Sequence, residues 1–243
     1  MIRALICDLY GTLLQVTPPE SPPTWDGLWR DALGMAPVMG EFEFSSRCRS
    51  EIEAVHRAKR ERGIRFPEVD WLDILSAAIG HQPREVLGRF AMVDAARQRN
   101  TMLMPGAAEV LAEARRRGMV CGLCSNAQAY TLSELHTTGA DLAFDPDFIF
   151  LSFQHGFAKP APEVFAWLAG RLTRRGIRSD EILMVGDRLD NDIAPASAAG
   201  WNTWLLTPHE SERSGKGTWR QLGGWLFGNA PSADTHDQAA PDE

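Results

Sequence analysis

Two different patterns of apolar and polar positions divide the chain. From Pro105 onwards, short apolar runs alternate with amphipathic stretches, a pattern typical of strands that alternate with helices. The expected strands are 119–124, 147–152, 181–186 and 201–206, and the expected helices are 105–117, 128–137, 161–175 and 191–199. An apolar run at 2–7 adds one more buried strand. Repeated strand–helix units predict an α/β fold with a Rossmann-like, doubly wound parallel sheet.

The stretch from 25 to 100 follows a helical period instead. Cys48, Ile52 and Val55 recur at helix spacing, and no segment there has the alternation of a strand. Before this stretch, QVTPPESPPTW contains four prolines, which predict an irregular linker and a domain boundary. We therefore expect a core domain formed by 1–16 and 101–228, with an inserted α-helical domain at 17–100.

The formal net charge of −7 is concentrated at the end of the chain. Residues 229–243 carry four acidic side chains and no Lys or Arg, so −7 less −4 leaves −3 for the rest. Such a modest charge gives no reason to expect nucleic acid or an anionic membrane as a partner. Residues 219–228 are expected to pack back on the core, whereas 229–243 have the composition of a disordered acidic tail.

Other features favour a cytoplasmic protein with a small-molecule substrate. No stretch approaches the roughly 18 apolar residues of a membrane helix, and Asp8 interrupts the first apolar run too early for a signal peptide. The four cysteines are too few for a disulfide framework. Cys121 and Cys124 form a C-x-x-C without a second Cys or His pair, which favours buried strand cysteines over a redox or metal site. The sequence carries no prediction of an oligomeric state.

Four short polar segments stand at the ends of predicted strands or in the loops that follow them. They are DLYGT at 8–12, Ser125–Asn126, Lys159 and GDRLDND at 186–192. The carboxyl ends of parallel strands meet at one crevice, so these segments are expected to converge there. Each segment alone is ordinary, since Asp in a turn or Lys before Pro is usually structural. Their order along the chain indicates a single catalytic site.

This order resembles the four motifs of the haloacid dehalogenase superfamily. The matching residues are D-x-x-G-T, a strand ending in Ser-Asn, GFAKPAPEVF, and GDxxxxD followed by AxxAG, over about 1–16 and 100–207. The segments SNAQAYT, HGFAKPAPEVF and HRAKRERGIRFPEVD are similar to those of a subfamily of bacterial hydrolases with a helical, C1-type cap. The resemblance implies a hydrolase, whose substrate it leaves open.

The resemblance also implies roles for individual residues. Asp8 would be the nucleophile that forms a covalent intermediate. Thr12, the Ser125 hydroxyl and the backbone amides near Asn126 would hold anionic oxygens of a small, anionic substrate. Lys159 would neutralise charge on Asp8 and on the transferring group.

A magnesium ion is the cofactor that the resemblance implies. Mg²⁺ would be held by Asp8, the main-chain carbonyl of Tyr10 and Asp187, with Asp192 as a further acidic residue that supports the metal site. The alternative interpretation of 187–192 is a helix N-terminus, where Asp190 and Asn191 would act as caps and as partners of the helix dipole.

Tyr10 departs from the phosphatase pattern. Phosphatases of the superfamily carry a second Asp at this place, which serves as general acid and then as base. A tyrosine, with an ordinary pKa of about 10, can donate a proton to a leaving alkoxide but is a poor base near neutral pH. The D-x-Y-G-T form is similar to that of the L-2-haloacid dehalogenases, which displace halide without metal, although those enzymes lack the Gly186–Asp187 carboxylate.

Three functions therefore remain open. The main prediction is Mg²⁺-dependent hydrolysis of a phosphate monoester of a small metabolite, with Asp8, Tyr10 and Lys159 as catalytic residues. The alternatives are metal-independent 2-haloacid dehalogenation and a catalytically weak protein that binds a phosphorylated ligand.

The predicted cap offers a few candidates for substrate contacts. His56 and Arg60 lie four residues apart on one helix face, so Arg60 is a candidate for binding an anionic substrate. The alternative is a solvated basic face formed with Arg57, Lys59 and Arg62. Tryptophans more often pack in a core or at a domain interface than around a ligand, and Trp25 and Trp29, beside the linker, are the two placed to line a cap cleft.

Overall fold

A six-stranded, wholly parallel sheet forms the centre of the core. The computed structural model describes residues 1–139 and 143–228, and the predicted acidic tail at 229–243 lies outside these residues. The strand order is β5-β4-β1-β6-β7-β8. The strands are β1 (Ala4–Cys7), β4 (Val120–Ser125), β5 (Ile149–Leu151), β6 (Ile182–Gly186), β7 (Asn202–Leu206) and β8 (Lys216–Gly217). The predicted α/β, Rossmann-like fold is confirmed.

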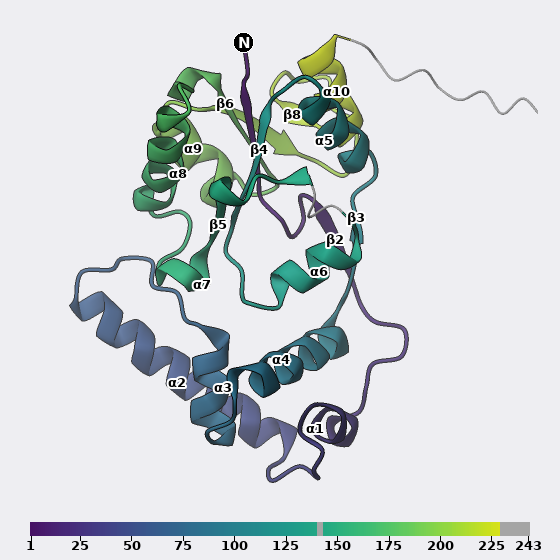
Figure 1. The fold of residues 1–243 in the computed structure, drawn as a ribbon, viewed down its shortest axis with the longest axis vertical. Coiled ribbons are helices and arrows are strands. Elements are labelled where there is room, and N and C mark those ends of the chain that lie inside the picture. The colour runs from purple at the N-terminus through teal and green to yellow at the C-terminus, as the bar shows by residue number, and fades with distance from the viewer. Residues whose placement is uncertain (140–142, 229–243) are drawn as a thin grey trace, which may run out of the picture.

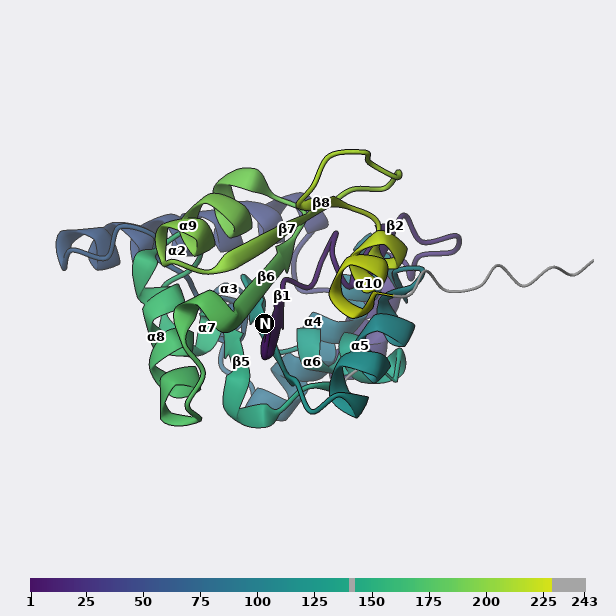
Figure 2. The same ribbon diagram turned by 90° about the horizontal axis from the view of Figure 1, so that it is seen from above.

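Helices cover both faces of this sheet (Figures 1 and 2). They are α5 (Ala107–Arg116), α6 (Thr131–Thr137), α7 (Ser152–His155), α8 (Pro162–Arg174), α9 (Ala194–Ala198) and α10 (Trp219–Phe227). Successive side chains of a strand point to opposite faces. Leu5 and Cys7 of β1 therefore pack in the cluster with α5 and α10, whereas Ala4 and Ile6 pack in the cluster with α8. Both faces are apolar, which explains the continuous apolar run at the start of the chain.

Four helices form the inserted segment, below the core in Figure 1. They are α1 (Trp25–Leu33), α2 (Glu41–Glu61), α3 (Trp71–Ile79) and α4 (Arg84–Gln98). Their apolar faces meet in a cluster of their own around Trp29 and Phe90. Cys48 is buried in this cluster, and Ile52 and Val55 pack against it, as the helical spacing predicted.

A small antiparallel sheet connects the inserted helices to the core. β2 (Leu14–Thr17) pairs with β3 (Asn100–Leu103). The prediction of irregular backbone directly after Leu14 is therefore wrong for Gln15, Val16 and Thr17. The prolines begin only at Pro18, so the preceding residues keep the backbone N–H groups that a strand requires.

The segment after β8 packs back on the core, as predicted. Trp219 and Leu222 of α10 are buried in the core, and the Trp219 indole N–H donates to the carbonyl of Thr12 at 2.8 Å. The predicted helix at 191–199 is instead a π-helical turn at Leu189–Ile193 that runs into α9.

The cysteines agree with a structural role. All four are free and buried, and burial raises the pKa of the Cys124 thiol to about 12. Among the described residues, no helix is both long enough and apolar enough to cross a lipid bilayer.

Candidate active site

Asp8 lies at the carboxyl end of β1, in the middle of the sheet. Its backbone N–H donates to the carbonyl of Val185 at 2.9 Å, which continues the pairing of β1 with β6. The chain then turns at Gly11, which has a φ of 82°. A Cβ at this position would collide with the Asp187 carboxylate. Glycine therefore allows the turn after Asp8 to approach Asp187 closely.

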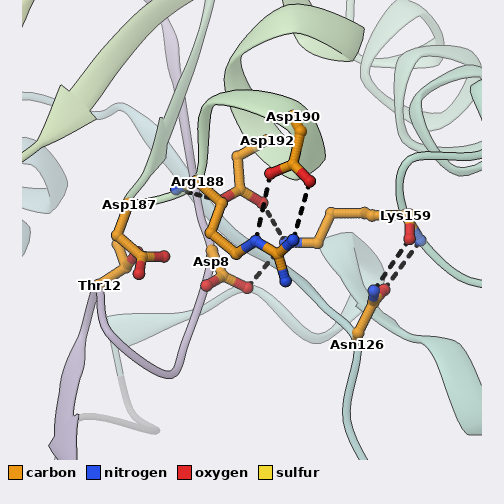
Figure 3. A network of polar contacts seen from close by, with 8 residues as sticks. All are labelled: Asp8, Thr12, Asn126, Lys159, Asp187, Arg188, Asp190 and Asp192. Carbon is orange, nitrogen blue, oxygen red and sulfur yellow. Dashed lines mark hydrogen bonds and ion pairs between the residues drawn. The ribbon is translucent and has the colours of Figure 1, made fainter.

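A buried lysine joins two carboxylates (Figure 3). The Lys159 ammonium donates to Asp8 Oδ1 at 2.7 Å and to Asp192 Oδ1 at 2.5 Å. The exposed fraction of these side chains is 1% for Lys159, 11% for Asp8 and 1% for Asp192. Burial alone would lower the pKa of Lys159, but the charges of Asp8 and Asp192 outweigh it and raise this pKa. Lys159 is therefore a fixed positive charge beside Asp8.

Asn126 holds the backbone of Lys159 with its side-chain amide. Asn126 Oδ1 accepts from the Lys159 N–H at 2.8 Å, and Asn126 Nδ2 donates to the Lys159 carbonyl at 3.0 Å. Ser125, at the end of β4, is buried next to it. The end of β4 thus fixes the lysine that neutralises Asp8, a contact that the sequence did not predict.

Asp187 brings a third carboxylate to the site. One oxygen each of Asp8, Asp187 and Asp192 lie within 4.8 Å of one another. The Thr12 hydroxyl donates to Asp187 Oδ1 at 3.3 Å. Burial and the negative charge of Asp8 raise the pKa of Asp187. Such mutual repulsion is relieved when a cation binds between the carboxylates.

The remaining acidic residues of this segment differ in their surroundings. Asp192 Oδ2 accepts from the backbone N–H of Arg188 at 3.1 Å. Asp190 is exposed and pairs with the Arg188 guanidinium at 2.8 Å (Figure 3). Neither the π-helical turn nor α9 has a side-chain cap at its N-terminus, so the expectation that Asp190 and Asn191 act as caps is wrong. Asp190 does lie in the first turn of the π-helical segment, where an acidic side chain suits the helix dipole.

Residues 2–200 match the family model for a haloacid dehalogenase-like hydrolase. The chain belongs to this family. The matched range includes Asp8, Lys159, Asp187 and Asp192, and it therefore spans the whole carboxylate–lysine cluster.

Curated relatives of this haloacid dehalogenase-like hydrolase are phosphatases. A phosphoserine phosphatase from Thermus thermophilus is 34% identical over 121 residues, which are 48% of this chain and 47% of the relative. A ribulose-1,5-bisphosphate 5-phosphatase from Halopiger xanaduensis is 35% identical over 109 residues, 44% of each chain. The matches thus span about half the length of these relatives.

Solved structures share the fold of this haloacid dehalogenase-like hydrolase. A HAD phosphatase from Thermococcus onnurineus is 22% identical with a TM-score of 0.59, covering 95% of this chain and 100% of that one. A 2-haloacid dehalogenase from Pseudomonas syringae is 22% identical with a TM-score of 0.57, covering 93% and 98%. Phosphatases and dehalogenases both appear, so the fold alone does not distinguish the two reactions.

The Tyr10 side chain lies in a polar cluster near the junction of α4 and β3. Its hydroxyl donates to Glu134, accepts from Arg99 at 3.0 Å and hydrogen-bonds with Thr131 at 3.0 Å. The Arg99 guanidinium also lies 4.7 Å from the centre of the Tyr10 ring. Burial and the bond to Glu134 raise the pKa of Tyr10. Arg99 and Glu134 were not predicted, because no short motif contains them.

The loop between α2 and α3 contacts the core next to Lys159. Phe66 O accepts from Ala158 N at 3.0 Å, and Glu68 N donates to Gly156 O at 3.0 Å. The Glu68 carboxylate accepts from the buried Ser152 hydroxyl at 2.7 Å. The inserted helices and the lysine loop are therefore directly joined.

One basic residue of α2 contacts the core, and the others face solvent. Lys59 donates to the carbonyls of Glu68 at 2.5 Å and Gly156 at 3.3 Å, so the prediction that it lies on a solvated face is wrong. Arg57, Arg60 and Arg62 are exposed. The substrate contact predicted for Arg60 stays a prediction.

Proposed function

We propose that this chain hydrolyses phosphate monoesters of small metabolites, with Asp8 as nucleophile and Mg²⁺ as cofactor. The observation that carries the proposal is the cluster of Asp8, Asp187 and Asp192, whose oxygens lie within 4.8 Å, beside the buried ammonium of Lys159. A carboxylate nucleophile between a fixed cation and further acidic ligands suits an anionic electrophile. The phosphatase relatives support the same chemistry.

The donor set fits magnesium, which prefers oxygen ligands. Asp8 and Asp187 would hold the ion together with the carbonyl of Tyr10. Asp192 is better suited to support this site, because its two oxygens already accept from Lys159 and from the Arg188 backbone. When bound, Mg²⁺ would supply Lewis-acid polarisation of the phosphoryl oxygens and neutralise their charge.

In the proposed reaction, a carboxylate oxygen of Asp8 forms a bond to phosphorus while the bond from phosphorus to the leaving alcohol oxygen breaks. Lys159 contacts Asp8 and neutralises charge that moves onto the phosphoryl oxygens. Thr12, the Ser125 hydroxyl and the backbone near Asn126 hold these oxygens in place. Water then hydrolyses the aspartyl phosphate, which releases inorganic phosphate and restores Asp8.

Tyr10 is the proposed proton donor to the leaving oxygen. Its raised pKa keeps the phenol protonated near neutral pH, so Tyr10 acts first as an acid. The phenolate that this step leaves takes up the proton lost by the attacking water, which restores Tyr10. The phenol donates its proton to a hydrogen bond with Glu134. This hydrogen bond would have to break before the proton is transferred to the leaving oxygen of the substrate. Arg99 and Thr131 position the ring for that transfer.

The second candidate is metal-independent 2-haloacid dehalogenation. The observation that favours it is Tyr10 itself, which occupies the place of the second Asp and whose phenol is bound to Glu134. Halide leaves without a proton, so this reaction needs no acid at that position. A chain that binds a phosphorylated ligand without turnover is the third possibility.

One assay separates these functions. Purified protein is given 4-nitrophenyl phosphate or 2-chloropropionate, each with Mg²⁺ and with EDTA, and release of phosphate or chloride is measured. Phosphate release that EDTA abolishes is the expected result. Chloride release that resists EDTA would replace the proposal by dehalogenation.

Asp8→Asn tests whether Asp8 is the nucleophile. It keeps the size of the side chain and removes the charge, and we expect it to abolish turnover with either substrate. Asp187→Ala should abolish only the Mg²⁺-dependent reaction. Activity of Asp8→Asn equal to that of the wild type would exclude Asp8 as the nucleophile.

A further inference from the structure

Glu68 is a carboxylate of the inserted helical segment that bonds to the core. It lies in the loop 62–70, between α2 and α3. Its Oε2 accepts from the buried Ser152 hydroxyl at 2.7 Å, and its Oε1 accepts from the Gln128 amide at 3.3 Å and from the Val69 N–H at 2.9 Å. Both carboxylate oxygens are therefore occupied, and two of the three donors belong to the core.

The Glu68 carboxylate sets the direction of the Ser152 hydroxyl. A hydroxyl has one proton to donate and can accept with its lone pairs. The Ser152 oxygen lies 2.7 Å from Glu68 Oε2 and 3.4 Å from the Ala127 carbonyl, and the shorter bond to a charged acceptor is the stronger one. With its proton in the bond to Glu68, the Ser152 oxygen accepts from the Ala127 N–H at 3.0 Å. Ala127 is thereby held by a bond that depends on Glu68.

Gln128 connects the next residue of the chain to the same loop. Its Nε2 donates to the Val69 carbonyl at 3.0 Å, and its Oε1 accepts from the Trp71 N–H at 2.8 Å. Ala127 and Gln128 directly follow Asn126. The chain after β4 is therefore bonded to the inserted segment at Gln128 and, through Ser152, at Ala127.

The same stretch of chain holds Lys159. The Asn126 side-chain amide bonds to the N–H and to the carbonyl of Lys159, at 2.8 and 3.0 Å. The residues before the lysine, 156–158, pair with 66–68 of the inserted segment through backbone hydrogen bonds. The Lys159 ammonium in turn lies 2.7 Å from Asp8 Oδ1. The inserted segment therefore fixes the lysine beside Asp8 by two separate routes.

We propose that Glu68 is a positioning residue for the reaction at Asp8. This inference rests on the proposed phosphatase function. Glu68 acts through residues 126–128, because its carboxylate holds them where Asn126 keeps the Lys159 ammonium against Asp8. A misplacement of about 1 Å in a reacting site can cost about 100-fold in rate. The inserted helices thus contribute to the reaction through a residue that lies outside the four motifs.

Glu68→Gln tests this role with a side chain of the same size. An amide has one acceptor oxygen and carries donors in place of the other, so either the Ser152 hydroxyl or the donors to Oε1 lose their acceptor. With 4-nitrophenyl phosphate and Mg²⁺, we expect kcat to fall about 10- to 100-fold. KM should change less than about threefold, because Lys159 neutralises charge that moves onto the phosphoryl oxygens in the transition state.

Ser152→Ala removes the connection between Glu68 and Ala127 from the other side. We expect it to lower kcat by a similar factor, again with little change in KM. This second variant decides the question if Glu68→Gln does not fold, and an unchanged kcat in Ser152→Ala would contradict the proposed route.

Glu181→Gln is the matched control. The Glu181 carboxylate also accepts from a backbone N–H, that of Arg178 at 2.9 Å. Glu181 directly precedes β6 and so lies at the opposite end of this strand from Asp187. Its substitution should lower the free energy of unfolding without changing kcat, and urea denaturation shows that both Gln variants are folded at the assay temperature.

Combining Glu68→Gln with Asn126→Ala separates positioning from a general loss of stability. If Glu68 acts through Asn126, the contact with the Lys159 backbone is already lost in Asn126→Ala, and adding Glu68→Gln should lower kcat less than about threefold further. Independent effects multiply instead. A double variant whose loss equals the product of the two single losses would overturn the inference.

The failures of the two proposals are distinguishable. If the wild type hydrolyses 4-nitrophenyl phosphate and Glu68→Gln has the same kcat as Glu181→Gln, the inference fails and the phosphatase proposal stands. If no phosphate ester is hydrolysed, the phosphatase proposal fails, and hydrogen exchange of the Ala127 amide tests the positioning directly. Exchange at least about tenfold faster in Glu68→Gln, with no change in Glu181→Gln, supports positioning by Glu68. Equal exchange in the wild type and Glu68→Gln overturns it.

Discussion

Replacing Lys159 by Met tests the electrostatics of the site in the absence of any substrate. The substitution keeps the length of the side chain but removes the ammonium that contacts Asp8 at 2.7 Å and Asp192 at 2.5 Å. Two carboxylates whose side chains are 11% and 1% exposed would then share a buried site without a counter-charge. Removing one partner of a buried ion pair costs about 3–5 kcal/mol. We expect a loss of this size in the free energy of unfolding at pH 8.

The sign of the pH dependence follows from the carboxylates. Burial already raises the pKa of Asp192, and the attraction of Lys159 opposes this shift. Without Lys159 the folded-state pKa rises further above its value in the unfolded chain. The loss in the free energy of unfolding is therefore present at pH values above the folded-state pKa of Asp192. It disappears as this carboxylate takes up a proton at lower pH. The variant should approach the stability of the wild type towards pH 5.

Urea denaturation between pH 5 and 8 measures this effect, in EDTA so that divalent cations cannot replace the ammonium. Lys216→Met, in β8 at the edge of the sheet, is the matched control and should change little. Adding Asp192→Asn to Lys159→Met should restore part of the stability. A urea midpoint for Lys159→Met that equals the wild type at pH 8 would refute the electrostatic argument.

Three further predictions concern neighbouring groups. Tyr10→Phe keeps the ring beside Arg99 but loses the phenol, so kcat should fall strongly for alkyl phosphates and little for 4-nitrophenyl phosphate; equal losses would exclude proton donation. Glu68→Gln removes the charge that accepts from Ser152 and should lower the free energy of unfolding by about 1.5–3 kcal/mol. Urea denaturation measures this loss, and Glu61→Gln, at an exposed position, is the control. The raised pKa of Asp187 means that Mg²⁺ affinity, measured by calorimetry, falls as pH drops towards it; a pH-independent affinity would contradict this.

Much of the core could be predicted because its signals are local. The buried strands at 2–7 and 181–186 are short apolar runs bounded by polar turns, and α8 has Pro162 in its first turn, where the missing N–H leaves no helical bond unmade. β2 was missed because its partner β3 lies far along the chain, so its stability comes from pairing rather than from its own pattern.

The carboxylate–lysine cluster was predictable for a related reason. Asp8, Asp187 and Lys159 stand at strand ends or in the adjoining loop, and a parallel sheet brings those ends together. The supporting contacts were not predictable, because Asn126, Glu68 and Arg99 act through pairings between distant segments. Nothing in the sequence around Glu68 indicates that its carboxylate will accept a hydrogen bond from the buried Ser152.

The pairing of β2 with β3 brings together the two points at which the inserted helices connect to the core. Thr17 and Asn100 are register partners, and partners in an antiparallel pair lie about 4.5–5.5 Å apart. The chain thus leaves and re-enters the core at nearly one point, and a two-residue hairpin turn could join these positions. A helical segment can therefore leave and rejoin the core here without interrupting β1. The strand that carries Asp8 can in this way be combined with helical segments of different shape.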